Sequence, residues 1–130
     1  MKEIKFKAFL KVDGRIYEVL IVDFLNKEAT LWDKETAVNF EASFKDIELL
    51  QFAGFKDKNS VEIYTGFFVR WGLRVYEICF DCGFYMHDLS GINPDYPITK
   101  EFKKASDEFE VIGNIYENPE ILKDRRWGRG

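Results

Sequence analysis

Apolar and polar residues alternate with a period of two along much of this chain, which is the pattern of half-buried β-strands. Residues 4–8 alternate hydrophobic side chains with lysines, and segments 9–12 and 15–23 continue as strands. Asp13-Gly14, between these two segments, is typical of a tight hairpin turn, because both central positions of such a turn favour a positive φ. The sequence therefore predicts an antiparallel meander, extended by a second turn at 24–27 and a third strand at 29–32.

The pattern is less regular in the middle of the chain. Ser43–Asp46 is compatible either with one helical turn or with a loop that leads into a strand at 48–52. Residues 54–60 are polar and predict a turn. Alternation resumes after Gly66, and it predicts three strands separated by glycine-containing turns: 67–71, 74–80 and 84–89. This order of strands and glycines is similar to the meander of an SH3-like barrel.

The last forty residues predict a loop at 90–97, a short helix at 100–106 and a closing strand at 111–116 with a bulge at Gly113. Asn118-Pro119 combines a helix-capping residue with proline at the first helical position, so one terminal helical turn is expected. We therefore expect a mainly β protein that is a single compact unit. Its predicted parts are an N-terminal antiparallel meander (1–53), an SH3-like β-barrel (54–122) and a frayed tail (123–130), with one or two short helices.

Composition supports an ordered β protein and argues against several functional classes. The 130 residues include 13 Phe, six Tyr and three Trp, which suit pleated surfaces and do not suit disorder. Residues 1–65 carry 10 basic and 12 acidic side chains, and residues 66–130 carry 9 and 11, so no basic region for duplex DNA is evident. No apolar run approaches the roughly 20 residues that span a bilayer. We expect a soluble, intracellular protein with reduced cysteines.

Three blocks of the sequence carry a family resemblance. They are IKFKA from Ile4, LLQFAGFKDKNSVEIYTGFFV from Leu49 and EVIGNIYENPEIL from Glu110. In order and spacing these blocks resemble the YopX family of bacteriophage and prophage proteins. The resemblance implies a phage or prophage origin, a location in the cytoplasm of the bacterial host cell, and no particular biochemical activity. The family usually has glycine where this chain has Ser60, so the turn here must tolerate a side chain.

Cys79 and Cys82 have the CxxC spacing that can serve metal or redox chemistry. Positions three apart on a regular strand face opposite ways, and zinc would need two further ligands, for which His87 and Asp88 are the nearby candidates. A catalytic role for His87 with either thiol would need partners that the spacing does not identify. We interpret the cysteines as small, partly buried side chains, and we predict no metal, no cofactor and no enzymatic activity.

Aromatic residues crowd the predicted barrel and supply the candidate binding surface. Adjacent rings such as Phe67-Phe68 and Phe84-Tyr85 lie on opposite faces of a strand, so one of each pair is expected to face solvent. The alternative is that a helix or the N-terminal meander covers this second face. The candidate binding residues are Tyr64, Phe67, Phe68, Trp71, Phe84 and Tyr85. The expected function is a non-enzymatic accessory module that binds a protein partner or forms a homo-oligomer. The alternative is single-stranded nucleic-acid binding by base stacking, assisted by Arg70, Arg74 and the arginines of residues 125–129.

Overall fold

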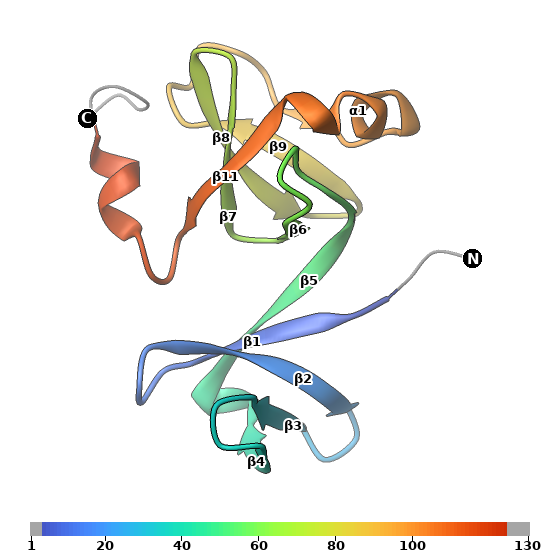
Figure 1. The fold of residues 1–130 in the computed structure, drawn as a ribbon, viewed down its shortest axis with the longest axis vertical. Coiled ribbons are helices and arrows are strands. Elements are labelled where there is room, and N and C mark those ends of the chain that lie inside the picture. Colours follow the sequence, from blue (N-terminus) through green and yellow to red (C-terminus); the bar gives the residue numbers. More distant parts are fainter. Residues whose placement is uncertain (1–3, 125–130) are drawn as a thin grey trace. The chain divides into compact units, whose positions relative to one another are not determined.

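The computed structural model describes residues 4–124, apart from the side chains of residues 101 and 102. Its strands form two antiparallel sheets, and its one α-helix has five residues, so the mainly β prediction is confirmed (Figure 1). The chain divides into two compact units, the first ending at Gln51 and the second beginning at Phe52. The predicted boundary lies two residues further on. No helix of the described residues is long and apolar enough to cross a bilayer.

The first unit is a meander of short strands with a 3-10 turn before the last strand. Its elements are β1 (Phe6–Leu10), β2 (Arg15–Asp23), β3 (Glu28–Asp33), β4 (Val38–Ser43), η1 (Phe44–Asp46) and the first half of β5 (Ile47–Lys56). The strands lie in the order β4-β3-β2-β1-β5. The helical alternative for residues 43–46 is correct, because Ser43 Oγ accepts a hydrogen bond from the Lys45 backbone N–H at the start of η1.

The β1–β2 hairpin forms as predicted, but its turn is longer than the Asp-Gly dipeptide suggested. The pairing ends at Leu10 and Arg15, which leaves a four-residue loop. Within this loop Gly14 has a φ of 70° and donates its N–H to Leu10 O at 2.9 Å. The Asp13 carboxylate accepts hydrogen bonds from the Arg15 N–H and the Tyr17 hydroxyl. The carboxylate thus organises a wider loop than a two-residue turn allows.

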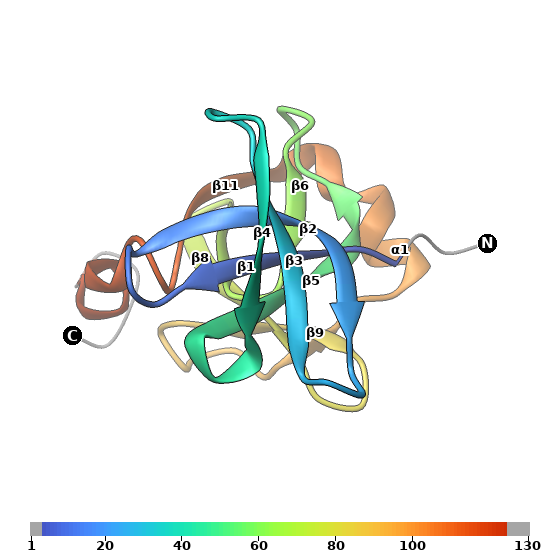
Figure 2. The same ribbon diagram turned by 90° about the horizontal axis from the view of Figure 1, so that it is seen from below.

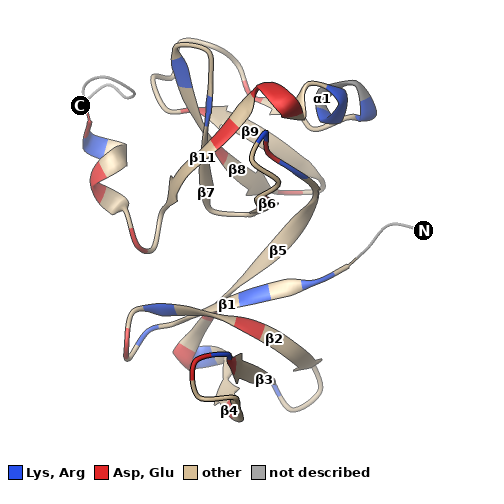
Figure 3. Ribbon diagram, viewed as in Figure 1, with Lys and Arg blue, Asp and Glu red and all other residues tan. Residues whose placement is uncertain are grey.

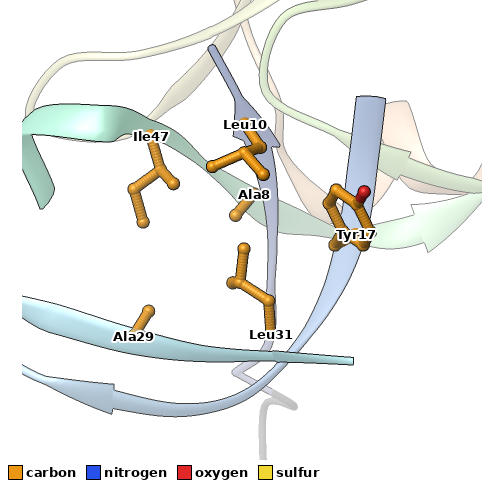
Figure 4. Close-up of a cluster of buried hydrophobic side chains, with 6 residues drawn as sticks. All are labelled: Ala8, Leu10, Tyr17, Ala29, Leu31 and Ile47. Carbon is orange, nitrogen blue, oxygen red and sulfur yellow. The ribbon is translucent and has the colours of Figure 1, made fainter. Parts of the chain in front are cut away.

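Alternate residues of the first unit's strands point into one apolar interior. The buried cluster consists of Ala8, Leu10, Tyr17, Ala29, Leu31 and Ile47, contributed by β1, β2, β3 and β5 (Figure 4). Phe40, from β4, packs against this cluster, and its ring meets the Tyr17 ring edge-on at 5.3 Å between centroids. The period-two pattern of the sequence therefore corresponds directly to the inward face of these strands.

The second unit is an open sheet with short helical segments at its carboxyl end. Its elements are the second half of β5, β6 (Glu62–Tyr64), β7 (Phe67–Trp71), β8 (Arg74–Phe80), β9 (Phe84–Asp88), β10 (Tyr96–Pro97), α1 (Lys100–Lys104), η2 (Ser106–Glu108), β11 (Phe109–Asn114) and η3 (Pro119–Lys123). The five-stranded sheet has the order β10-β9-β8-β7-β11, and β6 pairs with β5. No pairing between end strands closes either sheet within residues 4–124.

The three strands predicted after Gly66 are confirmed. The regular strand β4 of the first unit was not predicted, and in the second unit the errors fall on short or interrupted pairings. Gly54 was predicted in a turn but lies within β5, with a φ of 93° where the pairing with β6 is irregular. The two-residue strand β10 lies in the predicted loop 90–97, and β6 was not predicted. Strands this short carry too few residues to show alternation.

The predicted bulge at Gly113 is confirmed, and it explains the role of Asn118. The register of β11 against β7 shifts between Val111 and Gly113. A Cβ at Gly113 would lie 2.7 Å from Asn118 Oδ1, so the position requires glycine. That oxygen accepts a hydrogen bond from the Asn114 N–H at 3.2 Å. The prediction that the Asn118 side chain caps η3 is wrong, because its oxygen accepts a hydrogen bond from the preceding turn instead.

Asp57 joins the polar turn after β5 to β11. Its side chain is buried, and one carboxylate oxygen accepts the backbone N–H groups of Asn59 and Val61 at 2.8 and 2.9 Å. The other oxygen accepts the Val111 N–H at 2.8 Å, and the Lys58 N–H donates to Phe109 O at 2.9 Å beside it. The Asp57 carboxylate thus accepts backbone N–H groups that a neighbouring strand would otherwise have to accept. The turn is therefore a structural element of the fold.

Asp88 organises the loop after β9 in a similar way. It is fully buried, and its carboxylate accepts four hydrogen bonds, from the backbone and side chain of Ser90 and of Asn93, at 2.8–3.1 Å. Burial raises the pKa of this carboxyl, but the hydrogen bonds from Ser90 and Asn93 outweigh it, so that the pKa lies below its ordinary value. Asp88 is therefore fixed in place as a loop organiser.

Replacement of Asp57 by alanine should destabilise the protein strongly. Three backbone N–H groups in partly buried hydrogen bonds would lose their charged acceptor, at a cost of about 3 kcal/mol or more. Urea unfolding followed by circular dichroism measures this loss. Asp107→Ala, at an exposed position, is the matched control and should change stability by less than about 0.5 kcal/mol. Equal effects of the two variants would contradict the role of Asp57.

The stability contributed by Asp88 should depend on pH. Because its folded-state pKa is depressed, the ionised carboxylate stabilises the native state above the unfolded pKa of about 4, and this contribution is lost as pH falls through the folded pKa. Asp88→Asn should therefore be less stable than the parent at neutral pH, and the difference should shrink below about pH 4. Denaturant titrations across this range test the expectation, and a difference that does not vary with pH would refute it.

Ser60→Gly should stabilise the turn. Ser60 has a φ of 64°, a conformation that costs a residue with a side chain about 1 kcal/mol. Removal of the side chain should raise the unfolding free energy by up to about that amount. Asn59→Gly is the control, since Asn59 lies in the same turn without a positive φ and should lose stability when made more flexible. A stabilising Asn59→Gly would count against this explanation.

Candidate binding surfaces

Three of the six predicted binding rings lie in the core of the second unit. Phe68 has no exposed surface, and Tyr64 and Phe67 are 1% and 8% exposed. The Tyr64 ring packs between Phe52 and Phe67, with centroid distances of 5.5 and 5.7 Å. The expectation that one ring of the Phe67-Phe68 pair faces solvent is wrong, because both faces of β7 are covered within the chain.

The other three predicted rings are half-buried, and two of them, Trp71 and Phe84, contact other rings. Trp71 meets Phe109 at 5.1 Å and Tyr76 at 6.2 Å, and Phe84 meets Phe80 edge-on at 4.9 Å. Tyr85 is opposite Cys79 in the β8–β9 ladder. Ring-to-ring packing of this kind consumes the aromatic surface that the sequence suggested was available for a partner. Among the described side chains, the aromatic rings that are more than half exposed are those of Phe24 and Phe80.

The two cysteines of the CxxC motif lie in different surroundings. Cys79 is half-buried on β8, whereas Cys82 is exposed in the following turn with a φ of 59°. Burial, together with the neighbouring Glu77 carboxylate, raises the pKa of Cys79 to about 12, so its nucleophilic thiolate is disfavoured. His87 Nδ1 lies 2.8 Å from Asp95 Oδ1 at the surface, while Asp88 is held by Ser90 and Asn93. Within residues 4–124 no three His, Cys, Asp or Glu side chains gather as a metal site.

The basic residues proposed for nucleic-acid binding are engaged with protein groups. Arg70 Nη2 lies 3.1 Å from Glu110 Oε1, and Lys58 Nζ lies 3.1 Å from the other oxygen of the same carboxylate. Arg74 donates to Ser90 Oγ at 3.2 Å. Acidic and basic residues are interspersed along both units (Figure 3). The arginines of residues 125–129 lie outside the described residues.

An exposed apolar surface lies at the β2–β3 hairpin, where the alternation of the sequence does not predict one. Leu20, Ile21, Phe24 and Leu25, which we call the β2–β3 ridge, are 54%, 60%, 67% and 89% exposed. The ladder between β2 and β3 shifts register at Leu20, and such a bulge can turn side chains away from the core face. The Phe24 ring meets Phe44 edge-on at 5.9 Å, which holds it at the tip of the hairpin. Two apolar residues within a predicted turn, Phe24-Leu25, were the signal that could have identified this surface.

A groove of about 570 Å³ lies beside β4 in the first unit. It is lined by four consecutive β4 residues, 40–43, together with Leu10, Lys11, Val12 and Asp46. Val12 is 87% exposed. We call this cavity the β4 groove. A smaller, polar cavity of about 80 Å³ near Arg15 is crossed by the ion pair between Arg15 and Glu35 at 3.1 Å.

Comparison with known proteins agrees with the fold and the sequence blocks. Protein EF1440 from Enterococcus faecalis, known from a crystal structure, is 24% identical, with a TM-score of 0.62 over 94% of this chain and 99% of its own. At this identity the likeness concerns the fold alone. A search of curated proteins gives no match. The YopX protein family matches residues 5–123, which is nearly the whole described chain. The chain therefore belongs to the YopX family.

Proposed function

We propose that this YopX family member is a phage- or prophage-encoded accessory protein that works in the bacterial cytoplasm by binding another protein, without catalysis of its own. The β2–β3 ridge is the observation that carries the proposal. Four large apolar side chains within six residues are each more than half exposed, which is unusual for a surface that meets only water. Such a surface favours a partner that presents an apolar patch or groove.

The ridge also has the physical character of an interface centre. Ile21 is held by its pairing with Thr30 in the β2–β3 ladder, and Phe24 is held by its contact with Phe44, so these two positions lose little conformational entropy on binding. The polar residues Asp23 and Asn26, which hydrogen-bond to each other at 2.8 Å, flank the apolar tip. An apolar centre with a polar rim is the arrangement found in protein–protein interfaces. The aromatic residues that we first expected to form the surface instead stabilise the second unit.

Photo-crosslinking in cells tests this proposal. A photoreactive amino acid placed at position 25 should form a covalent adduct with a different polypeptide during prophage induction in the bacterial host. The same probe at position 73 is the matched control. Leu73 is 92% exposed but stands alone between Gly72 and Arg74 in a turn, so it should give no specific adduct.

A double variant tests whether the crosslinked partner binds through the β2–β3 ridge. Ile21→Thr combined with Leu25→Ser should retain the fold, since both side chains are exposed, and should weaken capture of the crosslinked partner by about tenfold or more. Leu73→Ser should leave capture unchanged. If position 25 gives no adduct beyond that at position 73, or if the double variant binds as well as the parent, the ridge is not the binding surface.

A further inference from the structure

Three of the four end strands of the two sheets have features that prevent pairing with another chain. β10 has two residues and includes Pro97, which lacks a backbone donor. β6 has three residues, and its register against β5 is irregular. β11 is interrupted by the bulge at Gly113. Short length, proline and bulges are the means by which natural sheets protect their edges.

β4 has none of these features. Its six residues pair with β3 without a break, from Val38 opposite Asp33 to Ser43 opposite Glu28, and they include no lysine, proline or glycine. In an antiparallel pair, every second residue directs its N–H and C=O away from its neighbour. Within residues 4–124 no backbone or side-chain group hydrogen-bonds to β4 on the side away from β3. β4 is therefore a regular, open edge (Figure 2).

The β4 groove lies along this edge. Its lining includes four consecutive residues of β4, and successive residues of a strand point to opposite faces of the sheet. The groove therefore follows the strand and is not confined to one face of the sheet. Phe40 and Ala42 belong to the face that packs on the core, and Leu10 and Val12 lie across the groove. The space beside β4 thus offers backbone hydrogen bonds together with apolar contacts, which is the combination required for strand addition.

We propose that β4 pairs antiparallel with β4 of a second copy of this chain, in the register that places Phe40 opposite Phe40. In this register Val38 is opposite Ala42 of the other copy, and Asn39 is opposite Glu41. The amide of Asn39 can donate to the carboxylate of Glu41 twice, once on each side of the two-fold axis. The strand is complementary to itself in this arrangement, and that complementarity is the reason for a second copy as the occupant.

The alternative register centred on Glu41 is disfavoured. It would place two carboxylates directly opposite each other, which destabilises strand pairing. The register centred on Phe40 also keeps the apolar face continuous, because Val38 and Phe40 of the second copy would extend the face that carries Phe40 and Ala42. Pairing would cover Val38 and Val12, which are 55% and 87% exposed in the single chain.

Sedimentation of the full chain over a wide range of concentration tests the proposal. The parent protein should show a monomer–dimer equilibrium. Asn39→Glu should weaken the dimer by about tenfold, because two pairs of opposed carboxylates would form across the axis. Combining Asn39→Glu with Glu41→Lys should restore dimerisation, since each carboxylate would then face an ammonium group of the other copy. Val38→Lys, at an exposed position, should weaken the dimer independently.

The outcomes separate this inference from the proposed function, because the β2–β3 ridge includes no residue of β4. A strictly monomeric parent, a dimer that neither Asn39→Glu nor Val38→Lys weakens, or a failure of Glu41→Lys to rescue Asn39→Glu would each overturn the pairing. A monomer that still crosslinks to a different polypeptide through position 25 would overturn the pairing alone. A dimer without such a crosslink would remove the proposed function and leave the pairing intact.

Discussion

Backbone hydrogen bonding at the ends of open sheets is the constraint on which this structure depends. A meander of short strands satisfies the N–H and C=O groups between its strands but leaves a row of them at each end. The unpaired backbone groups at the sheet edges differ between the two units of this chain. In the second unit it ends one edge at Pro97 and disrupts the other at Gly113, whereas in the first unit it leaves β4 regular and open. The chemistry available to a partner follows from that difference.

Buried carboxylates accept backbone N–H groups in the turns and loops, where no neighbouring strand is available to accept them. Asp57 supplies acceptors to a turn and to β11, and Asp88 supplies them to the loop after β9. The Asp57 contact also clarifies what the family blocks mean. Two of the three blocks meet through the hydrogen bond between Asp57 and Val111, and Lys58 bonds to Phe109, the residue just before the last block. These blocks of the sequence therefore contain residues whose hydrogen bonds connect separate strands of the fold.

The aromatic content and the exposed surface have separate roles. Rings in the second unit contact one another in series, from Phe52 through Tyr64 to Phe67 and from Phe55 through Phe109 to Trp71. Large rings of this kind fill the space between short strands that aliphatic side chains would leave empty. The surface that lacks an intramolecular partner is mostly aliphatic and lies in the first unit, at the β2–β3 ridge. A count of aromatic residues is consequently a poor guide to which side chains of this protein are exposed.

The sequence by itself determined the strand pattern, the hairpin at residues 10–15, the bulge at Gly113 and the family, because alternation, turn residues and spacing are local properties. The longer loop at Asp13 and the short strands β6 and β10 were not evident, since they depend on one carboxylate or on very few paired residues. Which rings are buried was decided only by the tertiary structure. Alternation assigns a side chain to one face of a strand, but whether that face meets solvent depends on distant segments that come to cover it, as they cover both faces of β7 and leave the β2–β3 ridge bare.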